Sequence, residues 1–121
     1  MKVVGFGFRS GASLSALDAL LDRLVEQYGA IDRLAVADSM WPLVARLGEA
    51  RGVAVIPVAE AALPQAATIT HSRHSLKARG TGSVAEAVAL IAAGDGAELL
   101  GPRMISADRK ATAALARGRI A

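Results

Sequence analysis

Short apolar segments typical of strands alternate with helix-like segments along the first 58 residues, and this alternation limits the fold more than any other feature. Residues 2–8 (KVVGFGF), 34–37 and 53–58 are apolar and short, as buried strands are. Between the first two, leucines recur at helical spacing from Leu14 to Tyr28. The order strand, helix, strand predicts an α/β domain with parallel strands and right-handed crossovers.

Polar residues and glycines mark where these helices are expected to begin and end. A serine or aspartate before the first turn accepts from free backbone amides, and glycine stops a helix by adopting a positive φ. The expected caps and stops are Ser13 or Ser15 with Gly29 for the first helix, and Asp38 or Ser39 with Gly48 and Gly52 for the second.

The second half of the chain is less regular. We expect one helical turn over 60–65, a short β-prone segment at 68–70, a loop over 71–82, a helix from Val84 to about Ala93 and a strand at 97–100. The last segment, ATAALARGRI, is ambiguous. Its alanines favour a helix, whereas its brevity and the polar turn before it allow a strand paired as a hairpin with 97–100.

Composition indicates one domain over residues 1–121 and excludes several classes of protein. The chain is 53% apolar, but no run approaches the roughly 18 residues of a membrane span, and no signal peptide is evident, so we expect a cytoplasmic protein. The absence of cysteine excludes disulfides and thiolate chemistry. The excess of positive charge lies in residues 71–121, which carry eight basic and four acidic side chains, but the four aromatic residues lie in the first half, which argues against nucleic acid.

The segment KARGTGSVAEAVAL joins a basic, glycine-rich loop to a helix start. Ser83 and Glu86 have the spacing of a capping box, which predicts a helix beginning at Val84. Free amides and the helix dipole at such a start attract phosphate or carboxylate, although most capped helices bind nothing. The residues that lead into it are Lys77, Arg79, Gly80, Thr81 and Gly82.

The first loop, GFGFRSGAS, invites comparison with a dinucleotide-binding fingerprint, but its spacing is GxGxxxG. Its glycines would let a ligand approach the backbone, and Arg9 offers a forked pair of donors to a carboxylate. A turn that needs glycine only for its geometry is an equal alternative. In a parallel sheet this loop and the one after Asp38 lie at the carboxyl ends of the strands, where ligands bind.

Other polar residues give no recognisable catalytic arrangement. His71 and His74 are too few to hold a metal, and Arg73 between them would repel a cation, so we expect no metal and no cofactor. Asp18, Asp38 and Glu86 are interpreted as caps or helix-surface charges. Trp41, just before Pro42, is expected to pack at a helix start. No nucleophile, base and orienting group can be assembled, and the catalytic residues stay unknown.

Three segments together, GFGFRSGAS, TGSVAEAVAL and ELLGPRMISADRKATAALARG, resemble the CobE/CbiG C-terminal-domain family of cobalamin biosynthesis. The resemblance implies a three-layer α/β/α sandwich with a mixed, mostly parallel sheet and a C-terminal antiparallel hairpin, so that the last segment is a strand. It also implies a role in corrin-ring assembly. The fused form is associated with opening a ring-A lactone and losing a two-carbon fragment, whereas the stand-alone form has a poorly defined role.

The chain departs from the family pattern in its first loop. The family often reads GCR there, whereas this chain has Phe8 in place of the cysteine and Ser10 where a second basic residue is common. A lysine frequent after the second strand is missing near Met40 and Trp41. Thiol chemistry is therefore out of reach, and the hydrolase activity of the fused form is not carried over.

Corrin precursors are flat rings that carry many carboxylates, and the candidate residues suit such a ligand. The first hypothesis is a protein that binds an acidic precorrin or corrinoid intermediate or passes it on, for instance to a pathway enzyme that it assists. The second is an enzyme that acts on that ligand with His71 or His74 as proton carrier, and the third is a nucleotide-binding module. The predicted ligand-binding residues are Gly7, Arg9, Ser10, Gly11, Asp38, Ser72, His74, Lys77, Arg79, Thr81, Gly82 and Ser83.

Overall fold

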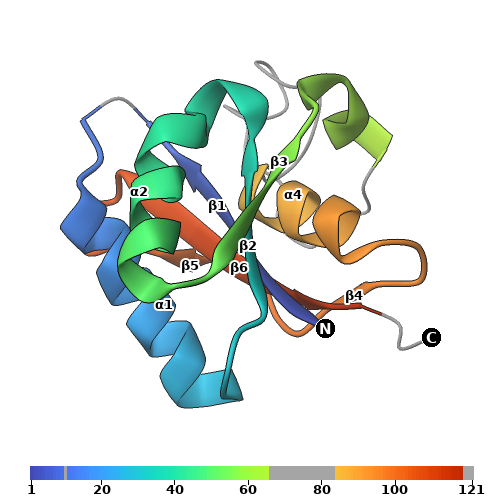
Figure 1. The fold of residues 1–121 in the computed structure, drawn as a ribbon, viewed down its shortest axis with the longest axis horizontal. Helices are drawn as coiled ribbons and strands as arrows, with labels where there is room; N and C mark the ends of the chain where they lie inside the picture. Colours follow the sequence, from blue (N-terminus) through green and yellow to red (C-terminus); the bar gives the residue numbers. More distant parts are fainter. Residues whose placement is uncertain (10, 66–83, 119–121) are drawn as a thin grey trace.

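The structure is a computed structural model that describes residues 1–9, 11–65 and 84–118. Within these ranges the chain forms three layers, with α1 and α2 on one face of a mixed sheet and α4 on the other (Figure 1). The predicted α/β/α class is confirmed. The elements are β1 (Lys2–Phe8), α1 (Leu14–Tyr28), β2 (Arg33–Ala37), the 3-10 turn η1 (Asp38–Met40), α2 (Trp41–Arg51), β3 (Ala54–Val58), the 3-10 turn η2 (Glu60–Gln65), α4 (Val84–Ala93), β4 (Glu98–Leu99), β5 (Met104–Ile105) and β6 (Ala111–Arg117).

The strands lie in the order β3-β2-β1-β6-β4, and β5 also pairs with β6. β1 pairs in parallel with β2, as β2 does with β3, which confirms the alternation of strand and helix in the first half. β6 runs antiparallel to β1 over the whole length of both strands. Because β4 and β5 are antiparallel to β6, every strand but β6 points the same way among the described residues.

Each face of the sheet has its own apolar core, because successive strand residues point to opposite faces. Val4, Phe6 and Leu34 are buried with the leucines of α1, whereas Val3 and its neighbours are buried with Val88 of α4. No helix among the described ranges has the length and apolar content needed to cross a lipid bilayer.

The ends of α1 agree with the sequence, whereas the start of α2 does not. Ser13 Oγ accepts from the Ala16 amide at 3.1 Å, and Gly29 ends α1 with φ 88°. The prediction that Asp38 or Ser39 caps α2 is wrong. Both residues belong to η1, and Met40 precedes α2 without a side-chain cap.

Gly48 and Gly52 have different roles in α2. Gly52 ends the helix with φ 67°, as expected. Gly48 does not close the helix but lies inside it, where a Cβ would come within 2.5 Å of Val55 Cγ2 and 2.7 Å of Val53 O. It is therefore a close-packing position between α2 and β3.

The ambiguous last segment is a strand, as the family resemblance implied. β6 pairs with β4 through Glu98↔Arg117 and Leu99↔Ala116, which is the hairpin partner considered from the sequence. Alanine favours helices in isolation, but here the alanines of β6 are buried between β1 and the two short outer strands. Tertiary packing therefore outweighs local preference.

The glycines of β1 bring α4 unusually close to the sheet. A Cβ on Gly5 would lie 2.3 Å from Ala85 O and 2.7 Å from Ala89 N, and one on Gly7 would lie 3.2 Å from Ala85 N. The sequence placed Gly5 and Gly7 both in the strand over 2–8 and in the loop GFGFRSGAS; the strand is confirmed and the loop is wrong, because both are paired inside β1. Their spacing serves helix–sheet contact.

This contact predicts a graded response to added methyl groups. We expect Gly5→Ala to lower the free energy of unfolding by about 2–3 kcal/mol and Gly7→Ala by about 1 kcal/mol, because only the first would strike backbone atoms of α4 at short range. Urea denaturation followed by circular dichroism measures both. Equal losses for the two variants, or no loss at Gly5, would contradict this account of α4 packing.

Candidate functional site

The carboxyl end of the sheet, defined by Arg9, Asp38 and the turn over 106–110, gathers segments from both halves of the chain. β1 ends at Phe8 and β2 at Ala37, so Arg9 and Asp38 follow directly. β6 runs the other way, so it begins at this end, where Ala111 pairs with Phe8. α4 also begins here, because a Cβ on Gly7 would lie 3.3 Å from Val84 Cβ.

The loop after β1 is held against the start of β6. The Arg9 amide donates to Lys110 O at 2.9 Å, and the Ala12 amide donates to Arg9 O at 3.1 Å. Gly11 has φ 89°, and a Cβ there would lie 3.6 Å from Lys110 Nζ. The Lys110 ammonium therefore lies beside this loop, and Arg9 and Lys110 are both exposed.

The turn that joins β5 to β6 is organised by Ser106 and Asp108. Ser106 Oγ accepts from the Ala111 amide at 3.1 Å and donates to Asp108 Oδ1 at 2.5 Å, and the Lys110 amide donates to the same oxygen at 3.0 Å. The Ser106 hydroxyl, followed by the Lys110 amide, holds the pKa of Asp108 below its ordinary value. Arg109 has φ 62°, the one positive φ outside glycine in the described ranges. These bonds hold the turn in a defined conformation.

Glu86 joins α4 to the segment before β5. Its side chain is fully buried, and Oε2 accepts from the Arg103 amide at 2.9 Å. The interpretation of Glu86 as a helix-surface charge is wrong, because packing around the first turns of α4 encloses it. The other half of the predicted capping box, Ser83, lies outside the described residues.

The predicted binding residues divide into two groups. Arg9, Gly11 and Asp38 lie at the carboxyl end of the sheet, and Gly7 lies just inside β1, where its carbonyl accepts from Thr112 Oγ1 at 3.0 Å. The structure thus places four predicted residues at one end of the molecule. The others lie outside the described residues: Ser10, Ser72, His74, Lys77, Arg79, Thr81, Gly82 and Ser83, together with His71.

Sequence reasoning missed Arg109 and Lys110, which the structure adds to this end of the molecule. The available signal was the polar turn SADRK directly before a strand-compatible segment. The polar turn alone does not locate these residues. Its position follows only once the segment after it is paired with β1, because this pairing brings Lys110 beside Arg9.

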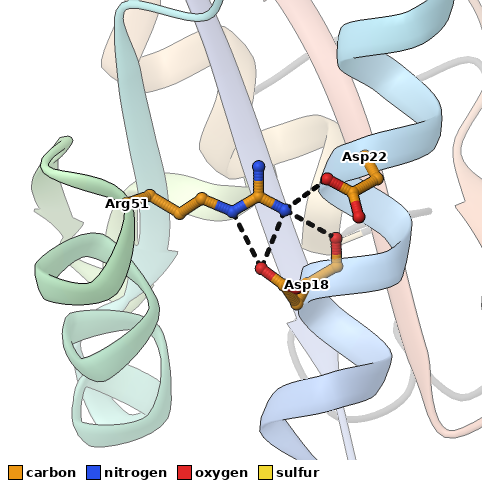
Figure 2. A network of polar contacts seen from close by, with 3 residues as sticks. All are labelled: Asp18, Asp22 and Arg51. Carbon is orange, nitrogen blue, oxygen red and sulfur yellow. Dashed lines mark hydrogen bonds and ion pairs between the residues drawn. The ribbon is translucent and has the colours of Figure 1, made fainter.

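Asp18 is not part of this site but belongs to a link between helices. Arg51, the last residue of α2, donates from Nε to Asp18 Oδ1 at 2.8 Å and from Nη2 to Asp22 Oδ1 at 2.5 Å (Figure 2). The bond to Asp22 contributes most to raising the pKa of Arg51 above its ordinary value. These groups stabilise the packing of α1 against α2. Asp18 thus forms a helix-to-helix ion pair.

Neither the groove beside α2 nor the arrangement of possible metal ligands indicates a second site. An open groove of about 430 Å³ lies between α2 and β3, lined by Trp41, Gly48, Glu49 and Val53 among others, and its charged lining residue is acidic. Trp41 begins α2, as expected, but remains 38% exposed. Within the part of the chain that the structure describes, no group of three histidines, cysteines or carboxylates is placed to hold a metal.

Comparison with known proteins agrees with these features of fold and sequence. Residues 2–116 match the family model described as cobalamin synthesis G C-terminus. The chain belongs to this family. No curated protein matches it. The region matched by the cobalamin synthesis G C-terminus family model includes all of β1 and almost all of β6.

Solved structures of cobalamin-biosynthesis proteins share this architecture. CobE, a protein from the cobalamin (vitamin B12) biosynthetic pathway, is 33% identical with a TM-score of 0.85, and the match covers 97% of this chain and 89% of CobE. Cobalamin biosynthesis protein chiG from Agrobacterium tumefaciens is 30% identical with a TM-score of 0.77, and the match covers 99% of this chain and all of that one.

A more distant similarity shows the fold alone. A putative cobalamin biosynthesis protein G homolog from Sulfolobus solfataricus is 19% identical with a TM-score of 0.77, and the match covers 98% of this chain but 37% of that protein. The same domain architecture is therefore also found as a minor part of a longer chain.

The bond between Glu86 and Arg103 joins two of the segments that resemble this family, TGSVAEAVAL and ELLGPRMISADRKATAALARG. We expect Glu86→Ala to lower the free energy of unfolding by about 2 kcal/mol, because it removes a buried acceptor. Glu86→Gln keeps an acceptor oxygen for Arg103 and should cost less. Urea denaturation and hydrogen exchange at the Arg103 amide measure the effect. Unchanged exchange at Arg103 in Glu86→Ala would contradict the proposed link.

The turn over 106–110 gives a prediction about pH. Because the folded pKa of Asp108 is lowered, the stabilisation it provides is present above the unfolded pKa of about 3.9 and is lost as pH falls through the folded value. Ser106→Ala removes the main cause, so the pKa of Asp108 should rise toward its ordinary value. Carboxyl NMR titration measures this change, and an unchanged pKa would contradict the role assigned to Ser106.

Proposed function

We propose that this member of the cobalamin synthesis G C-terminus family binds an acidic precorrin or corrinoid at the carboxyl end of its sheet and holds it or passes it on. The observation that carries the proposal is the convergence of Arg9 and Lys110, both exposed, on one loop. Cations at the rim of a site suit the many carboxylates of a corrin precursor. We expect such a protein to act in the cytoplasm, where it would deliver the ligand to a pathway enzyme.

The relatives support the pathway part of this proposal. CobE and chiG are named as cobalamin-biosynthesis proteins, and both match this chain over nearly its whole length. The family and the fold thus point to corrin chemistry, and the charge at the carboxyl end of the sheet points to an acidic ligand.

The two alternatives have less support from the described residues. A nucleotide-binding fingerprint needs its glycines in the turn between strand and helix, whereas Gly5 and Gly7 are paired within β1 and packed against α4. An enzyme that uses His71 or His74 as proton carrier remains a prediction, since both histidines lie outside the described residues.

A binding titration tests the proposal. A corrinoid acid added to the protein should change both the ligand absorbance and the fluorescence of Trp41, which is the single tryptophan and begins α2 just after the carboxyl end of β2. We expect Arg9→Gln to weaken binding about tenfold, the effect of losing one charge-assisted hydrogen bond.

Arg33→Gln provides the matched control. Arg33 is exposed and pairs with Val3 at the opposite end of the sheet, so the same change of charge should leave the dissociation constant unchanged. No binding of the corrinoid acid at roughly tens of micromolar would reject the proposal. Equal weakening by both variants would show a general charge effect and reject the assigned site.

A further inference from the structure

Three exposed cations lie on neighbouring backbone segments at the carboxyl end of the sheet, although these segments are about a hundred residues apart in sequence: Arg9, Arg109 and Lys110. The β1–β6 register sets their positions, because Phe8 pairs with Ala111 and the next residues, Arg9 and Lys110, are joined by a backbone hydrogen bond of 2.9 Å. We name these three residues the cationic cluster.

The charge of the cationic cluster is not neutralised by a close ion pair within the described residues. No side-chain hydrogen bond or ion pair engages the guanidinium of Arg9 or of Arg109 there. The nearby carboxylate, Asp108, has Oδ1 committed to the Ser106 hydroxyl and the Lys110 amide. Asp108 therefore shapes the turn, and its single negative charge, which also acts on Lys110, leaves the three cations with a net positive charge.

The turn also limits the motion of the cluster. Ser106 and Asp108 hold the backbone on both sides of Arg109, and the Arg9 amide ties the second segment to Lys110 O. Donors on an ordered backbone lose less conformational entropy when a ligand binds. Two guanidinium forks and one ammonium on a fixed frame suit carboxylates, which accept two parallel hydrogen bonds and carry the opposite charge.

We propose that the cationic cluster is a carboxylate-binding site that distinguishes a peripherally carboxylated ring from the same ring carrying amides, an inference that rests on the proposed function. An amide is neutral and has one acceptor oxygen, so it leaves the second donor of each fork unpaired. On this inference the protein binds its ligand while these carboxylates are still free. Arg109 and Lys110 extend the site beyond the residues predicted from the sequence.

The test compares a corrinoid acid with the corresponding peripheral amide of the same ring. We expect the protein to bind the acid about a hundredfold more tightly than the amide. The double variant Arg109→Gln, Lys110→Gln should reduce this preference at least about tenfold by weakening acid binding while changing amide binding little. The control is Arg33→Gln, Arg46→Gln, which removes the same charge from exposed positions of β2 and α2 and should preserve the preference.

A second probe separates this inference from the proposed function. Benzenehexacarboxylate has many carboxylates but no corrin ring, and calorimetry should show that the protein binds it and that the Arg109, Lys110 double variant binds it more weakly. If the corrinoid acid binds but the double variant keeps the preference for the acid, the inference is wrong and the proposed function stands. If no corrinoid binds while benzenehexacarboxylate binds through the cluster, the carboxylate site stands and the proposed function fails. If neither probe binds, both are overturned.

Discussion

The antiparallel pairing of β1 with β6 is the interaction on which the rest of the structure depends. It runs from Lys2↔Arg117 to Phe8↔Ala111 and places two segments from opposite parts of the chain in the middle of the sheet. β2 and β3 extend from the β1 side of this pair, and the short strands β4 and β5 lie on the β6 side. The same register brings Lys110 beside the loop that follows β1. The pairing of β1 with β6 therefore both assembles the sheet and forms the candidate site.

Charged residues serve two different purposes in this domain. Asp18, Asp22 and Arg51 join α1 to α2 (Figure 2). Buried Glu86 joins α4 to the segment before β5. Glu86 needs a partner within the fold because a buried charge is costly without one, whereas the ion pair of Asp22 with Arg51 lies at the surface. The cations at the carboxyl end of the sheet are instead exposed, and under the proposed function their partner is an external anion.

Local patterns predicted the elements better than they predicted roles of single residues. The first strand, the cap at Ser13 and the span of α4 were all correct, because each depends on neighbours in the sequence. The start of α2 was wrong because a 3-10 turn took up the residues expected to cap it. Gly5 and Gly7 were assigned to a loop because GxG resembles a ligand-binding turn, whereas their function depends on α4, about eighty residues away. Arg9, Gly11 and Asp38 lie at the carboxyl end of the sheet, as predicted, and their role in binding stays a prediction.

By itself the sequence determined the α/β class, the order of the first strands and helices and the excess of positive charge in residues 71–121, since periodicity, caps and composition are local properties. Only the tertiary structure decided that the alanine-rich last segment is a strand, that Glu86 is buried and that Arg109 and Lys110 stand near Arg9. The physical reason is that each of these outcomes depends on a partner distant in sequence. Hydrogen bonding to β1 and burial against α4 outweigh the preference of alanine for a helix, and the position of each charge follows from that pairing.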